Sequence, residues 1–206
     1  MRTAAIWMPM AVGPVLGVVF ATACNKHPSG GTLPFTMEEI APQTPPGTQA
    51  ELLLAGTTYS VDLKTTDKAG NLRIDLIGHG EVFETEDYEY DPHSFSVEEA
   101  AEEQYAPPLP LLTFPIRTED PVSWSGTLTS GHIGRQATAT VTTTTERSYL
   151  GGAGEDTLKV NVVLNMVADP NHPPLSRQLV FWFARGRGLV KREFGTTSVR
   201  QPPNAQ

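Results

Sequence analysis

The side chains with the clearest capacity for chemistry are carboxylates that crowd two neighbouring stretches of the chain. These acids are Glu81, Glu84, Glu86, Asp87, Glu89 and Asp91, followed by Glu98, Glu99, Glu102 and Glu103. Two carboxylates about 5–9.5 Å apart across a cleft can act as acid and base on a polymer, and several together can bind calcium. The spacing matches no calcium-binding loop. We therefore favour a solvated acidic face and keep a hydrolase that uses these acids as an alternative.

The histidines, serines and glycines fit no catalytic, metal-binding or phosphate-binding motif. The five histidines show neither an H-x-x-x-H nor an H-E-x-x-H spacing, which a zinc site on one helix face requires. No serine lies in a Gly-x-Ser-x-Gly turn. The glycines at 151–154 lack the Lys-Ser/Thr of a phosphate-binding loop. We predict no catalytic residue, no metal site and no cofactor, and hence a protein that is not an enzyme.

Cys24, the only cysteine of the chain, follows a segment whose composition suggests a defined chemistry. The segment before it begins with Arg2, continues uncharged and mostly apolar over residues 4–23, and ends in small residues, Ala21-Thr22-Ala23. This three-part layout is typical of a secretory signal. Because Cys24 has no second cysteine as a partner, an intrachain disulfide is excluded.

Cys24 and the residues before it resemble the lipobox of bacterial lipoproteins. The resemblance implies that residues 1–23 are removed and that the Cys24 thiol carries a diacylglyceryl group. Acyl chains contribute roughly 0.8 kcal/mol per buried CH₂, so several of them anchor a protein stably in membrane lipid. Ala21 stands where the lipobox usually has leucine. Cleavage by ordinary signal peptidase, which leaves a free thiol, and a retained transmembrane helix are the alternatives.

The charge and length of the chain narrow the partners and the location that we expect. The 206 residues carry a formal net charge of −8, which phosphate backbones repel, so binding to nucleic acid is excluded. The part after residue 23 is long enough for one domain. We expect a lipid-anchored protein on the periplasmic side of a bacterial envelope. Asn25 after the cysteine, by resemblance to bacterial lipoprotein sorting, favours the outer membrane over the inner one.

The mature chain divides by composition into a tether and a folded domain. Residues 24–50 are rich in proline and glycine and lack apolar periodicity, which predicts a tether. Residues 51–206 carry repeated alternation of apolar and polar side chains, which predicts β-strands. The clearest strands span about 57–66 and 158–166. The Asp169–Pro174 stretch is predicted to be a hairpin loop.

The strand patterns predict a mainly β domain with about seven strands and one helix. Ser96 and Glu99 have the spacing of a capping box, so we predict a short peripheral helix over about 97–105, stopped by the prolines that follow. The last strand is predicted over about 189–200. Consecutive hairpins imply a single antiparallel sheet. We expect it to be a curved sheet or half-barrel, or else a sandwich.

The strand at 178–184 is apolar on both faces. Phe181 and Phe183 point to one side and Trp182 to the other. Both faces of such a strand are covered in a sandwich or on a strongly curved sheet, and a curved sheet can leave a cavity. With Trp124, these aromatic residues form the face that we expect to contact an apolar ligand.

The later half of the chain resembles a group of bacterial envelope proteins of uncharacterised function. The resemblance covers about residues 107–200 and rests on Phe114-Pro115, on Trp124, and on the aromatic strand and Gly-Leu-Val-Lys element of residues 182–191. Arg185 replaces a proline of the pattern. Such proteins are similar in sheet layout to outer-membrane lipoprotein carriers, whose half-barrels hold acyl chains. The resemblance implies a curved sheet with a cavity and no catalytic residue.

These observations leave several functions open. The first is a non-enzymatic envelope lipoprotein that binds an apolar ligand or an envelope partner. The second is a structural or assembly scaffold, which an exposed, unpaired strand edge would favour. The third is an anchored hydrolase that uses the acids between residues 81 and 103. We rank them in that order.

Overall fold

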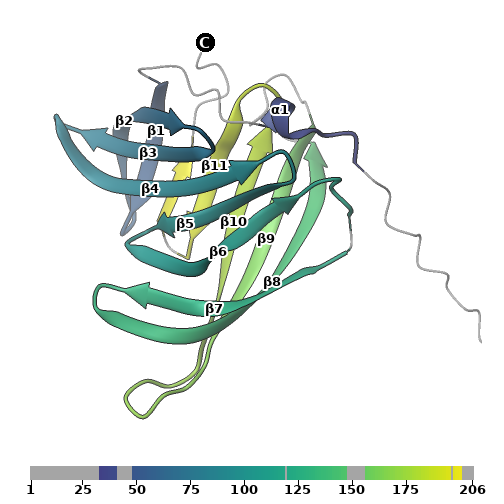
Figure 1. The fold of residues 1–206 in the computed structure, drawn as a ribbon. Helices are drawn as coiled ribbons and strands as arrows, with labels where there is room; N and C mark the ends of the chain where they lie inside the picture. Colours follow the sequence, from purple (N-terminus) through teal and green to yellow (C-terminus); the bar gives the residue numbers. More distant parts are fainter. Residues whose placement is uncertain (1–32, 41–47, 119, 148–155, 196, 201–206) are drawn as a thin grey trace, which may run out of the picture.

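The protein folds into an antiparallel β-barrel with one short helix (Figure 1). The computed structural model describes residues 33–40, 48–118, 120–147, 156–195 and 197–200. Each strand pairs with its neighbours in the sequence, and β1 also pairs with β12, which closes the sheet. The strands are β1 Thr48–Leu54, β2 Thr57–Lys68, β3 Asn71–Gly78, β4 Glu81–Asp91, β5 Ser94–Ala100, β6 Glu103–Thr113, β7 Val122–Ser130, β8 Ile133–Arg147, β9 Asp156–Met166, β10 Leu175–Ala184, β11 Gly188–Phe194 and β12 Thr197–Arg200.

The prediction of a mainly β fold with a single antiparallel sheet is confirmed, but the half-barrel and the count of about seven strands are wrong. The sheet has twelve strands in the described part of the chain and closes on itself. Closure occurs where Leu52 of β1 pairs with Val199 of β12, and both side chains are buried. The sequence also predicted one strand over 189–200, whereas β11 and β12 are separated there by a turn with Gly195 at φ +63°.

The predicted helix over 97–105 is a β-hairpin instead. β5 and β6 are joined by Ala101 and Glu102, whose φ angles are +53° and +61°. Positive φ at both central residues gives a two-residue turn whose twist matches that of the flanking strands. Val97 and Ala100 are fully buried, and β5 has a register shift between Val97 and Glu99. The shift places these two residues, three apart, on the same inner face, so their spacing mimics a helix.

Part of the predicted tether packs against the barrel. Residues 33–40 include the helix α1 (Met37–Ile40), and Phe35, Met37 and Ile40 are all buried. The Leu33 N–H donates to the Ile116 carbonyl at 2.9 Å. These apolar side chains are few, and the run that holds them is too short to stand out from the proline- and glycine-rich residues around it. Burying them against the core still stabilises the segment.

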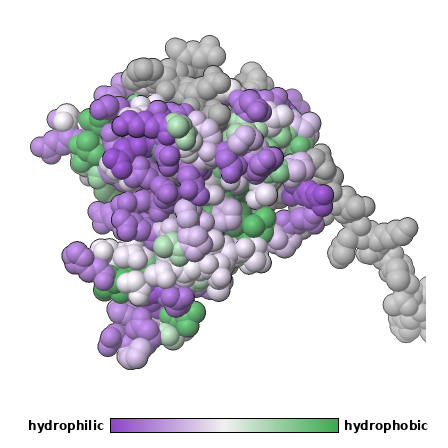
Figure 2. Space-filling view, in the orientation of Figure 1, coloured by the Kyte–Doolittle hydropathy of each residue, from purple (hydrophilic) through white to green (hydrophobic). Residues whose placement is uncertain are grey.

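The inside of the barrel is filled by apolar side chains, which alternate with polar ones along strands such as β3 and β9. Phe95 of β5 contacts Phe183 of β10 with ring centroids 5.3 Å apart, and Phe181 contacts Phe194 at 5.5 Å. On the face in Figure 2, hydrophilic residues dominate and hydrophobic ones lie in small groups. No helix among the described residues is long and apolar enough to cross a membrane.

Candidate functional site

The barrel wall has a weak seam between β6 and β7. These strands pair only from Glu103 opposite Ser130 to Ala106 opposite Thr127, although both continue well beyond those pairs. Neighbouring pairs in the same wall run much further, as between β7 and β8, which pair from Val122 to Ser130. Beyond Ala106, β6 stays with β5 while β7 stays with β8, so the two strands diverge.

Prolines explain why the β6–β7 ladder stops. If the register of the first pairs continued, Ser125 would face Pro108 and Ser123 would face Pro110. Proline has no N–H, so it cannot donate to a neighbouring strand. The Pro107 carbonyl accepts a hydrogen bond from the Trp124 indole Nε1 at 3.0 Å in place of a backbone donor.

A glycine marks the point where the strands separate. A Cβ on Gly126 would lie 2.5 Å from the Ala106 carbonyl oxygen, 2.6 Å from the Trp124 ring and 2.9 Å from Pro107. No real Cβ approaches a backbone oxygen that closely, so only glycine lets β7 pass β6 at this distance. The end of the ladder is therefore set by side-chain chemistry on both strands.

The β7 backbone presents unpaired groups at this seam. Ser130 and Ile133 close the two-residue turn between β7 and β8, so their N–H and C=O groups bond each other. Bonding direction alternates along an antiparallel strand. Trp124 therefore bonds to β8, whereas Ser123 and Ser125 point their backbone groups toward β6. In the described part of the chain, these two residues have no backbone partner on that side.

A hollow of about 260 Å³ lies at the open end of the seam. Leu111 and Val141 reach it from the inner face of the wall, and Phe114 and Ile116 reach it from the connection between β6 and β7. The exposed rim carries Arg117 and Asp120, which pair at 3.8 Å. The hollow is thus mainly apolar, and the charges of Arg117 and Asp120, the described charged residues of its rim, balance each other.

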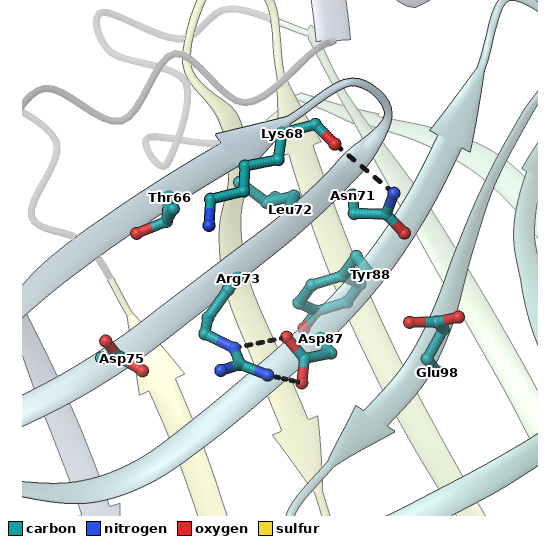
Figure 3. Close-up of a pocket in the computed structure, with 9 residues that line it drawn as sticks. All are labelled: Thr66, Lys68, Asn71, Leu72, Arg73, Asp75, Asp87, Tyr88 and Glu98. Atoms are coloured by element: carbon teal, nitrogen blue, oxygen red, sulfur yellow. Dashed lines mark hydrogen bonds and ion pairs between the residues drawn. The ribbon is translucent and has the colours of Figure 1, made fainter.

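A second, larger hollow of about 490 Å³ lies on the outer face of β2–β5 (Figure 3). Arg73 and Asp87 point toward each other across adjacent strands and form two hydrogen bonds of 2.8 and 2.7 Å. The Asp75 carboxylate accepts from the Thr85 hydroxyl at 3.0 Å. Most of the charges here are therefore satisfied by their neighbours.

Glu98 is the acid of this polar hollow with the least compensation. Burial raises its pKa, and the nearby carboxylates of Glu89 and Asp87 raise it further. Lys68 lines the same hollow, from β2. The polar hollow is a surface of mixed charge, and its strands pair with their neighbours over most of their length, apart from the register shifts beside Glu98.

The acidic cluster is divided between the outside and the inside of the barrel. Glu86 is fully buried and its Oε1 lies 2.5 Å from Nε of Arg192 on β11, while its Oε2 accepts from the Tyr88 hydroxyl at 3.0 Å. Burial raises the pKa of Glu86, and the positive charge of Arg192 opposes that rise. The Arg192 Nη2 is buried without a partner among the described residues.

Glu103 is the second acid that the barrel buries. It pairs with Arg177 of β10, and burial lowers the pKa of that arginine. The prediction of a solvated acidic face is therefore wrong for Glu86 and Glu103. Each of these carboxylates is opposed by an arginine from the C-terminal half of the sequence, and that pairing across the barrel is invisible in a linear pattern.

The four aromatic residues predicted to form an apolar-ligand face do not share one face. Phe181 and Phe183 are fully buried in the main core, to which Trp124 also belongs. Trp182 lies on the opposite side of β10, in a separate cluster. Its ring is covered by the Lys191 ammonium at 4.2 Å and the Lys159 ammonium at 5.3 Å. None of these four residues lines either hollow described above.

Other predicted positions fall in different places. Cys24 and the signal segment 1–23 lie outside the described residues, as do the glycines at 151–154. His172 is in the predicted hairpin loop, where its Nδ1 lies 2.9 Å from Asp169. Within the described ranges, no group of three or more His, Cys, Asp and Glu side chains is arranged to hold a metal ion.

Comparison of the chain with protein-family models, curated proteins and solved structures finds no match in any of the three. The similarity to envelope proteins and to lipoprotein carriers therefore stays a prediction. The seam was not predicted, although the sequence contained a signal for it. In the sequence, Pro107, Pro108 and Pro110 predict the end of a helix, whereas in the structure they lie within β6, where proline indicates a strand edge that cannot donate to a neighbour.

Proposed function

We propose that the protein is an exported bacterial lipoprotein, anchored through acylated Cys24, that binds an envelope partner at the seam between β6 and β7 and performs no catalysis. The observation that carries the binding role is the seam itself. It combines an apolar hollow with strand groups that have no backbone partner among the residues that the structure describes. Such an edge is where another chain can add to a sheet.

The anchor is supported by Cys24 and the small residues before it. Acylation would hold the barrel close to a membrane surface, and the proposed location is the periplasmic side of the outer membrane. A protein confined to a surface meets other envelope proteins at high local concentration, so even a modest interface can be occupied. This supports a binding role for the anchored barrel.

The absence of catalysis is proposed because the two acids that the barrel buries are both engaged. Glu86 contacts Arg192 and Tyr88, and Glu103 contacts Arg177. A general acid or base must reach the proton that it transfers. A carboxylate that is buried and bonded to an arginine has little such access.

An apolar small molecule is the second candidate for the occupant of the hollow. Leu111, Phe114, Ile116 and Val141 give the hollow an apolar lining. The volume of about 260 Å³ lies near the lower end of small-molecule sites. A short acyl group suits this space better than a whole lipid. The unpaired backbone groups of β7 have no role in that reading, so we rank it second.

The anchor is tested by expressing the full chain and its Cys24→Ser variant in a bacterium that processes lipoproteins. The wild-type protein is expected in the membrane fraction, with the added mass of acyl chains on an N-terminal Cys24. The variant is expected in the soluble periplasmic fraction. Equal distribution of the two proteins, with no added mass, would contradict the anchor.

The binding role is tested by placing a photo-crosslinking amino acid at Thr113, an exposed residue of the hollow. The matched control is Asp62, which is exposed and lies on a strand that is paired on both sides. A discrete adduct with one envelope protein from Thr113, and none from Asp62, is the expected result. Similar labelling patterns from both positions would count against a binding site at the seam.

A further inference from the structure

The unpaired groups of β7 have the geometry of a strand that awaits a neighbour. Ser123 and Ser125 both direct their N–H and C=O groups toward the seam, two residues apart, which is roughly 6.8 Å along a strand. An antiparallel partner bonds to alternate residues with this repeat. The opposite strand cannot supply donors to the Ser123 and Ser125 carbonyls, because Pro108 and Pro110 lie in the facing positions and have no N–H.

The chemistry of the seam selects among occupants. The N–H and C=O groups of Ser123 and Ser125 recur every second residue, and another extended backbone carries donors and acceptors with the same spacing. A bound strand also points every second side chain to the same side, and here that side is the apolar hollow beside Leu111 and Val141. An extended peptide segment with an apolar residue therefore satisfies both the hydrogen bonds and the hollow.

Charge at the rim narrows the occupant further. Arg117 and Asp120 are both well exposed and pair with each other, so the charged rim residues that the structure describes are one cation and one anion. Ser123 and Ser125 are exposed and neutral. A strongly charged segment would gain nothing here. An uncharged segment, apolar on one side and polar on the other, is complementary to both the hollow and the rim.

We propose that β7 accepts an extended, uncharged segment of an envelope protein as an added strand, bonded to the backbone of Ser123 and Ser125 and placing an apolar side chain in the hollow. This inference rests on the proposed function, because it names the chemistry of the partner at the same seam. Strand addition uses main-chain hydrogen bonds for affinity and side-chain pockets for selectivity.

The test compares two double variants of the full-length protein, each with the photo-crosslinker at Thr113. Ser123→Pro with Ser125→Pro removes the two N–H groups that face the seam. It leaves the bonds to β8, which come from Trp124 and from every second residue on either side of it. Ser123→Ala with Ser125→Ala keeps both N–H groups and removes only the hydroxyls. Slow amide exchange at Trp124 confirms that β7 is intact in each variant.

The proposal expects the wild-type adduct to map to one extended segment of one partner. Loss of two backbone hydrogen bonds is expected to lower the adduct yield about tenfold or more in the proline variant, with little change in the alanine variant. A synthetic peptide of the mapped segment should slow amide exchange at Ser123 and Ser125. The same peptide with N-methyl groups on alternate residues should not.

Other outcomes overturn the proposal in distinguishable ways. Adducts of equal yield in all three proteins would leave the binding role standing and would show that it does not use strand addition. A co-purifying apolar small molecule that protects Thr113 from crosslinking would replace the peptide as the occupant. Thr113 adducts that are no more specific than those of Asp62 would overturn both the strand addition and the proposed function.

Discussion

The burial of the Glu86 and Arg192 ion pair sets how much the free energy of unfolding should fall when one partner is removed. The two side chains are 0% and 1% exposed and lie 2.5 Å apart. Removing one partner of such a pair leaves the other charge buried without compensation, which costs about 3–5 kcal/mol. Glu86→Gln is therefore expected to lower the free energy of unfolding by about that amount, a large share of the 5–15 kcal/mol that is typical of a domain.

The matched control is the exposed pair of Arg73 and Asp87, whose side chains are 56% and 21% exposed. Solvent screens that pair, so Arg73→Gln is expected to cost less than about 1 kcal/mol. Urea unfolding of both variants is monitored by fluorescence. The dependence of the free energy of unfolding on urea concentration is compared as well, because a change in it would report a change in the surface exposed on unfolding. The midpoint should fall much further for Glu86→Gln.

A combined variant separates the pair from its environment. Replacing Glu86 with Leu, Arg192 with Met and Tyr88 with Phe removes both charges and the hydroxyl that bonds to Glu86. Hydrophobic residues of similar volume often restore or exceed the stability of a buried ion pair. The reasoning is refuted if Glu86→Gln costs no more than the Arg73 control, or if the triple variant is less stable than Glu86→Gln.

Two further predictions concern the seam and a turn. Gly126→Ala is expected to destabilise the protein by about 1–3 kcal/mol, because its Cβ would overlap the Ala106 carbonyl. Gly134→Ala is the control in urea unfolding, since a Cβ there would lie no closer than 3.4 Å to its nearest neighbour. Equal losses of stability in the two variants would contradict the close approach at Gly126. The pKa of Asp169 is lowered by the Asn171 N–H and by His172. A carboxylate with a lower pKa in the folded state adds stability above its ordinary value of 3.8, and that stability is lost as the pH falls through the folded pKa. Asp169→Asn should therefore reduce the difference in melting temperature between pH 6 and pH 3, and an unchanged difference would argue against the turn contacts.

Local alternation made several strands predictable, while closure of the barrel was not. Strand β2 was predictable because Tyr59 and Val61 alternate with polar residues before a turn at Gly70. The pairing of Leu52 with Val199 joins opposite ends of the sequence, and no local pattern encodes such a contact. Closure also brings in short strands, such as β12, that are too short to show a period.

Tertiary contacts also overrode local signals at two places. The Ser96 and Glu99 spacing satisfies a capping box, but burying the Val97 and Phe95 side chains in a strand stabilises the segment more than its local helix propensity does. Glu86 looked like one acid among many until the fold placed Arg192 beside it. Charges that are buried and paired across a barrel cannot be told from solvated ones without knowing the partner strand.

The most direct test of the open seam is amide hydrogen exchange along β7, measured by NMR on the purified protein without a partner. Trp124 bonds to β8 and is expected to exchange slowly, whereas Ser123 and Ser125 face the seam and are expected to exchange far faster. The alternation of fast and slow amides is the result that the open edge predicts. Equal protection of all three amides would mean that β6 and β7 close the wall, and the proposed binding site would not exist.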